Sequence, residues 1–170
     1  SADDFFTGTR SAVFGGTTTT LSFAQQIPGE SLRKTVQDYH ECARPKAVID
    51  YGFHLIISDP TEQVLGQDLP ALVADGMPSF KVYMTYDSLK LDDRQMLEVL
   101  STARRCGAMV MIHAENHDMI KWLTDRLLSG GYVAPKFHAI SHADIAEGEA
   151  THRAIRLSQL MDVPILLVHV

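Results

Sequence analysis

The sequence lacks the features of several large classes of protein. Its two cysteines, Cys42 and Cys106, fit no metal-binding spacing, so we expect reduced thiols within helices. No apolar run approaches the roughly 18 residues of a membrane-spanning helix, and the first residues lack the zones of a signal peptide. Lys and Arg total 15 against 21 Asp and Glu, a net charge of -6, which leaves no basic surface for nucleic acid. We therefore expect a cytoplasmic protein with neither membrane nor nucleic acid as partner.

Loops that bind nucleotide phosphates are also missing. No GxGxxG or Walker sequence follows any of the expected strands, which weakens the hypothesis of an open α/β module that binds a small anion. The composition itself is ordinary, with 45% hydrophobic and 21% charged residues in 170. It is typical of a globular protein whose length suffices for a substantial buried core.

Short apolar runs alternate along the chain with segments of helical spacing. We expect strands at residues 17–23, 48–57, 79–84, 108–114 and 164–170, and helices at 31–43, 61–74, 92–106, 115–129 and 145–160. All strands but the first are almost continuously apolar, as in parallel sheets covered by helices. Asp92 with Gln95 predicts a capping box, and Gly107 predicts the end of that helix.

This βα alternation, with a period of roughly 30 residues, predicts an α/β fold. An open doubly wound sheet and part of a (β/α)₈ barrel both satisfy it, and the missing nucleotide loops favour the barrel. Because five strands cannot close an eight-stranded barrel, we expect residues 1–170 to form a partial catalytic TIM-barrel domain, a fragment of a longer protein. The polar stretch 128–144 predicts an excursion on the catalytic rim or at an oligomer contact.

Three expected strands carry a polar group that a buried strand does not need. Lys81 lies inside SFKVYM, His113 ends AMVMIH, and His169 ends PILLVH. Their spacing is about one and two repeats of the period, so in a barrel they could face one point at the carboxyl ends of the strands. Imidazoles are common zinc ligands, and a catalytic zinc keeps one position open for water. Taken alone, each histidine is more often a hydrogen-bonded core residue.

Lys81 is the hardest of these residues to explain by packing. An ammonium in a buried strand must pair with an anion, lose its proton or be chemically changed, because its desolvation is costly. Reaction of the neutral amine with carbon dioxide gives a carbamate whose two oxygens can bridge a pair of metal ions. A salt bridge is the alternative. The remaining histidines are expected in the core (His54) or on helix faces and in the long loop (His40, His117, His138, His142 and His152).

Several stretches together resemble the D-hydantoinase and dihydropyrimidinase family of cyclic amidohydrolases. They are DDFFTGTRSAVFGGTT, DYGFH, SFKVYMTY, HAEN, EGEATHRAIRLSQL and VPILLVHV, and they keep their order along essentially the whole chain. The resemblance implies a (β/α)₈ barrel with a small β-sandwich and two divalent metal ions, usually zinc. It places the family's carboxylated, metal-bridging lysine on Lys81 and two ligands of the second metal on His113 and His169.

The resemblance also implies substrate contacts and a reaction. The family's tyrosine that hydrogen-bonds the developing oxyanion falls on Tyr86, and Tyr83 is expected to share the strand face of Lys81 and to contact substrate. The implied activity is metal-dependent ring opening of hydantoins or dihydropyrimidines to N-carbamoyl amino acids, in a homotetramer. The family's HxH pair and proton-carrying aspartate have no counterpart in residues 1–170, so we expect the isolated chain to be inactive.

Two alternatives within this fold remain, and one departure from the family pattern stands out. A non-catalytic dihydropyrimidinase-like scaffold would have no reason to keep the lysine beside two imidazoles, and Tyr86 favours the hydantoin and dihydropyrimidine branch over an allantoinase. Where the family often has Arg-Pro, this chain has His142 and Ala143. The sequence gives no chemical reason for that change.

Overall fold

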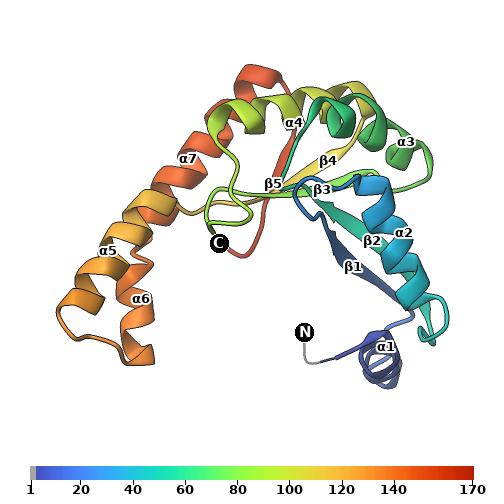
Figure 1. Ribbon diagram of the computed structural model, residues 1–170, viewed down its shortest axis with the longest axis horizontal. Coiled ribbons are helices and arrows are strands. Elements are labelled where there is room, and N and C mark those ends of the chain that lie inside the picture. The colour runs from blue at the N-terminus through green and yellow to red at the C-terminus, as the bar shows by residue number, and fades with distance from the viewer. Residues whose placement is uncertain (1–2) are drawn as a thin grey trace. The chain divides into compact units, whose positions relative to one another are not determined.

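A computed structural model describes residues 3–170, in which five strands alternate with helices as expected (Figure 1). The elements are α1 (Phe5–Phe14), β1 (Thr19–Gln25), α2 (Leu32–Ala43), β2 (Asp50–Ile56), η1 (Val64–Asp68), α3 (Leu69–Ala74), β3 (Ser79–Tyr83), α4 (Asp93–Cys106), β4 (Met109–His113), α5 (His117–Ser129), η2 (Pro135–Phe137), α6 (His138–Ser141), α7 (Asp144–Met161) and β5 (Ile165–Leu167). They form two compact units, one up to Phe80 and one from Lys81 to Val170. The assignment of the whole chain to one partial barrel domain stays a prediction.

The first unit is built on the parallel pair β1 and β2, in which Thr19 lies opposite Asp50. Helix α2 covers one face of this pair. The ring of Phe53 in β2 is buried against Tyr39 and His40 of α2, with centroid distances of 5.7 and 4.9 Å. Aromatic packing of this kind holds α2 against β2, the strand that comes after it in the chain.

Asp68 joins two helices of the first unit. Its buried carboxylate accepts hydrogen bonds from the Leu32 amide at 2.9 Å and the Ser31 hydroxyl at 2.8 Å, so it caps the start of α2 from a distant position. The expected helix 61–74 is a π-helical turn, η1, followed by α3. The π turn ends at Asp68, the residue that makes the cap.

The second unit contains the parallel pair β4 and β5, with Val110 opposite Ile165. The Met84 amide, just after β3, donates to the His113 carbonyl at 3.0 Å and ties the end of β3 to the end of β4. Helix α7 is closely packed through a stripe of alanines with no exposed surface, at positions 146, 150 and 154. The side chain of Arg153 in α7 forms an ion pair with Asp93 of α4 at 2.8 Å.

Both expected ends of α4 are confirmed. Asp92 and Gln95 form a reciprocal capping box. The Gln95 amide donates to the Asp92 side chain at 2.8 Å, and the Asp92 amide donates to the Gln95 side chain at 3.0 Å. Gly107 adopts a φ of 68°, which glycine tolerates better than other residues because it has no Cβ. The helix therefore starts and stops where its sequence indicates.

Three features differ from the sequence prediction. Helix α1 was not expected, although Asp4 and Thr7 form a capping box at its start. The last strand, expected over 164–170, ends at Leu167 because His169 has a φ of 42° that a strand cannot contain. The stretch 128–144, expected as an irregular excursion, contains η2 and α6, and α6 runs beside α5 (Figure 1).

The structure also bears on the expectations for the two cysteines and for membrane-spanning helices. Both cysteines are free and lie in helices, Cys42 in α2 and Cys106 in α4. Within residues 3–170, no helix has both the length and the apolar character needed to cross a membrane.

Candidate metal centre and active site

His113 and His169 meet at the carboxyl ends of β4 and β5. His113 is the last residue of β4, and the Val168 amide donates to the Ile112 carbonyl at 3.3 Å, which keeps the chain beyond β5 beside β4. His113 Nδ1 lies 3.1 Å from His169 Nε2. Two nitrogens bound tetrahedrally to one zinc at 2.0–2.1 Å would be about 3.3 Å apart. The spacing of the pair therefore fits two ligands of a single zinc ion.

Among the described residues, the buried amine of Lys81 has no hydrogen-bond or ion-pair partner. The residue lies in the middle of β3 and is 3% exposed, and among the described residues no group hydrogen-bonds its Nζ. Burial lowers the pKa of Lys81 to about 8. The expected alternative, a salt bridge to a carboxylate, is absent from the described part of the chain. An orphaned, easily deprotonated amine fits the formation of a carbamate.

Tyr83 links the lysine to the histidine pair. Its ring lies 3.8 Å from Lys81 Nζ, measured to the ring centroid, so the expected shared strand face is confirmed. The same ring stacks on His113 with a centroid distance of 5.4 Å. Burial lowers the pKa of His113, and the nearby charges of Lys81 and His169 lower it further against the opposing effect of Glu115. The lysine and both histidines thus belong to one cluster.

Tyr86 lies in a loop that turns back toward this cluster. The loop is closed by the Leu91 amide, which donates to the Tyr83 carbonyl at 2.9 Å. Tyr86 itself has a φ of 72°, a costly conformation for a residue with a Cβ, and its ring centroid lies 5.1 Å from that of His113. Burial and the charge of Glu115 raise the pKa of Tyr86, so its hydroxyl keeps its proton for donation.

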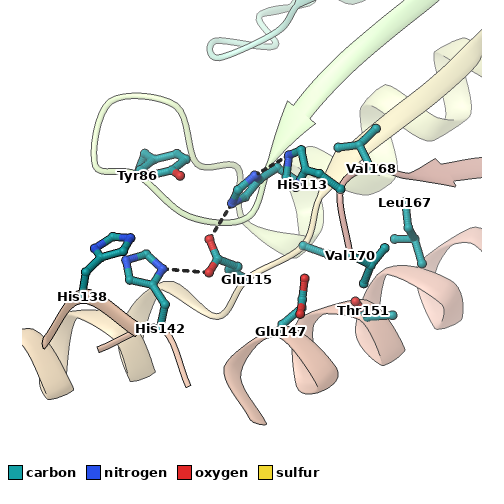
Figure 2. Close-up of a pocket in the computed structure, with 12 residues that line it drawn as sticks. Tyr86, His113, Glu115, His138, His142, Glu147, Thr151, Leu167, Val168 and Val170 are labelled. Atoms are coloured by element: carbon teal, nitrogen blue, oxygen red, sulfur yellow. Dashed lines mark hydrogen bonds and ion pairs between the residues drawn. The ribbon is translucent and has the colours of Figure 1, made fainter. Parts of the chain in front are cut away.

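Glu115 and His142 are the residues that sequence reasoning missed. They line a cavity of about 260 Å³ together with Tyr86, His113 and His169. Figure 2 shows the Glu115 carboxylate between two imidazoles, with Oε2 2.6 Å from His113 Nε2 and Oε1 2.8 Å from His142 Nδ1. The only sequence signal for Glu115 was its place two residues after His113 in HAEN. His142 had been expected simply on a helix face or in the long loop.

The rest of the metal-binding prediction is incomplete within this chain. Across residues 3–170, no three His, Cys, Asp or Glu side chains are grouped so that they could hold a metal ion. The described chain therefore offers two imidazoles and one modifiable lysine. His54, expected in the core, is half-buried in β2, where its Nδ1 lies 2.6 Å from the Ser79 hydroxyl.

Comparisons with known proteins place this chain in a family. The chain is 45% identical over 170 residues to a D-hydantoinase of Geobacillus stearothermophilus, covering 99% of this chain and 36% of that protein. A D-phenylhydantoinase of Escherichia coli is 40% identical over 171 residues, covering 99% and 37%. A solved D-hydantoinase structure matches with a TM-score of 0.97 and 43% identity, over 100% of this chain and 37% of that one. The chain belongs to the D-hydantoinase and dihydropyrimidinase family.

The solved dihydropyrimidinase of Brevibacillus agri extends this relationship, with a TM-score of 0.95, 45% identity, and coverage of 99% of this chain and 37% of that one. No family model matches the chain. The chain spans little more than a third of the length of these hydantoinase-family relatives. The expected family and the expected fold, part of a (β/α)₈ barrel, are confirmed. The roles of Lys81, His113, His169, Tyr83 and Tyr86 stay predictions.

Proposed function

We propose that the protein containing this chain opens the ring of hydantoins or dihydropyrimidines by metal-dependent hydrolysis of a cyclic amide, giving N-carbamoyl amino acids. Its relatives are named D-hydantoinase and dihydropyrimidinase, which supports this reaction class. The observation that carries the proposal is the buried, unpartnered amine of Lys81 in one cluster with two converging imidazoles. A protein without catalytic function has no need for this costly arrangement.

Lys81 is suited to carbamate formation because much of it is neutral near physiological pH. With a pKa of about 8, about a quarter of the amine is unprotonated at pH 7.5, against about 0.1% for an ordinary lysine. The neutral nitrogen attacks the carbon of carbon dioxide, a C–N bond forms, and one proton leaves to solvent. The resulting carbamate is an anion with two oxygens, where the ammonium had been a cation.

The residues present fit part of a two-metal site. His113 Nδ1 and His169 Nε2 would hold one zinc ion, and a carbamate on Lys81 would bridge it to a second. Bound divalent ions would supply an activated water as nucleophile and polarise the ring carbonyl. The remaining ligands of the second ion have no counterpart among the described residues, so the isolated chain is expected to lack activity.

Two tyrosines would act on the substrate. The Tyr86 hydroxyl would donate a hydrogen bond to the oxyanion that develops on the ring carbonyl, where a single well-placed donor can be worth a factor of about 100 to 1,000 in rate. Tyr83, whose ring contacts both Lys81 and His113, would contact an apolar or aromatic substituent of the substrate. The role of Tyr86 depends on the loop conformation that brings its ring to His113.

The experiment compares the full-length protein with its Lys81→Ala variant. A chimera in which residues 1–170 replace the matching segment of the G. stearothermophilus enzyme provides a second form. Wild type is expected to bind two zinc ions per chain, to show a carbamate carbon by NMR after incubation with ¹³C-bicarbonate, and to hydrolyse dihydrouracil or 5-phenylhydantoin. Lys81→Ala should lose all three properties, and Lys121→Ala, at an exposed lysine of α5, should keep them.

Other results would assign the chain differently. Wild type that lacks metal, carbamate and hydrolysis would favour the scaffold alternative, and a clear preference for allantoin would favour an allantoinase. The cytoplasmic location and the homotetramer are also part of the proposal, and the homotetramer rests on resemblance to the family. Light scattering of the purified full-length protein would test the tetramer.

A further inference from the structure

The carboxylate of Glu115 is held between two imidazoles in the second unit. Oε2 lies 2.6 Å from His113 Nε2 and Oε1 lies 2.8 Å from His142 Nδ1, so both oxygens are engaged (Figure 2). We propose that Glu115 is a positioning residue for His113, and that His142 in turn positions Glu115. Glu115 and His142 would then orient the His113 nitrogen that faces His169.

The hydrogen-bond chemistry of the cluster determines which nitrogen of His113 carries a proton. An ionised carboxylate only accepts, so the proton of a neutral His113 belongs on Nε2, where it is donated to Glu115. The lone pair is then on Nδ1, the atom 3.1 Å from His169 Nε2. Ligating histidines commonly donate their other ring N–H to a carboxylate, which fixes the tautomer and the ring orientation. Glu115 makes this contact with His113.

Glu115 is half-buried, and each of its two carboxylate oxygens has one imidazole as its partner. Without His142, one carboxylate oxygen would lose its partner. The carboxylate could then rotate away from His113. His142 would therefore influence the orientation of the His113 ring without contacting it.

His142 is itself fixed by its local structure. It follows α6, and its amide donates to the His138 carbonyl at 3.1 Å. The ring of His138 packs on that of His142 with a centroid distance of 4.2 Å. The Nδ1 atom is therefore presented to Glu115 from a segment 27 residues further along the chain. This contact gives His142 a chemical role at the position where the family often has arginine.

The inference rests on the proposed metal site, and metal affinity is its main test. Zinc binding to the full-length protein would be titrated against a chromophoric chelator, and the absorption spectrum of the cobalt form would report the ligand geometry. Glu115→Ala should weaken the site of His113 and His169 by about 10- to 100-fold and alter the cobalt spectrum. His142→Ala should weaken it about tenfold or less, because the direct bond to His113 survives. Glu115→Gln, whose amide oxygen can still accept from His113, should recover part of the loss.

Glu147→Gln is the matched control. Glu147 lines the same cavity and carries the same charge, but it makes neither of the two hydrogen bonds. Its removal should leave the zinc affinity and the cobalt spectrum unchanged. Equal weakening by Glu147→Gln and Glu115→Gln would overturn the inference, because the effect would then follow net charge. Unchanged zinc affinity in Glu115→Ala would overturn it as well.

A measurement on metal-free protein keeps this inference separate from the proposed function. Nitrogen-15 NMR of labelled histidines reports the tautomer of His113, and the inference requires the proton on Nε2. An Nδ1-protonated His113 would overturn it even if a variant failed to fold. Wild type without zinc but with the Nε2 tautomer would contradict the proposed function and leave the hydrogen-bond arrangement supported.

Discussion

Replacing Lys81 by methionine should stabilise the metal-free protein. At pH 7 the lysine is largely charged in both the folded and the unfolded chain, and in the folded chain the ammonium is buried against the Tyr83 ring with no hydrogen-bond or ion-pair partner among the described residues. A pKa lowered from 10.5 to about 8 corresponds to about 3 kcal/mol, at 1.36 kcal/mol per unit. Methionine has a similar length and no charge, so Lys81→Met should raise the free energy of unfolding at pH 7 by up to about 3 kcal/mol.

The pH dependence gives this prediction a definite sign. Between pH 8 and 10.5 the unfolded wild type binds more protons at position 81 than the folded form, so its stability rises with pH in this window. The advantage of Lys81→Met should therefore shrink to about 1.4 kcal/mol at pH 9.5. Urea unfolding of chelator-treated full-length protein at both pH values measures it. Lys121→Met, at an exposed lysine, should change stability by less than about 0.5 kcal/mol.

A less stable Lys81→Met at pH 7 would refute the reasoning, because it would mean that the ammonium has a favourable partner in the folded protein. The same variant should bind fewer zinc ions than wild type, since no carbamate can form on methionine. Stability and metal binding are therefore expected to change in opposite directions.

Three further predictions concern single residues. Tyr86→Phe should lower kcat of the full-length enzyme by about 100-fold or more, with zinc content unchanged, because one oxyanion donor is lost; unchanged kcat would remove Tyr86 from the reaction. Gly107→Ala should destabilise the protein by about 1 kcal/mol in thermal unfolding, because its φ of 68° suits glycine. Asp68→Ala should cost about 2 kcal/mol in urea unfolding, because the Leu32 amide and Ser31 hydroxyl lose their acceptor. Asp68→Asn should recover much of that loss, and equal loss in both would contradict the capping role.

Local sequence patterns predicted the strands and helix ends well because their signals lie within a few residues. The Asp92 capping box and Gly107 delimit α4 as expected, and the placement of His113 at the end of β4 followed from an apolar run that stops at a polar residue. The length of the last strand was overestimated, because apolar character continues past the point where the backbone turns at His169.

Contacts between distant segments could not be predicted in this way. Asp68 caps a helix that begins 36 residues earlier, and Glu115 meets an imidazole 27 residues later. Both contacts depend on the path of a turn or an excursion whose conformation no periodicity specifies. The strand pattern and the family resemblance both singled out Lys81, His113 and His169, but neither gave a reason for His142. The hydrogen bond between His142 and Glu115 supplies a reason, and this contact is visible only in the folded structure.

The left-handed backbone at His169 sets a limit on attempts to improve the protein. Glycine or asparagine would occupy a φ of 42° at lower energy, and a selection for thermal resistance alone would be expected to favour them at this position. Either replacement would remove the imidazole that faces His113. At residue 169, a substitution that stabilises the folded protein would therefore remove a residue of the candidate metal site.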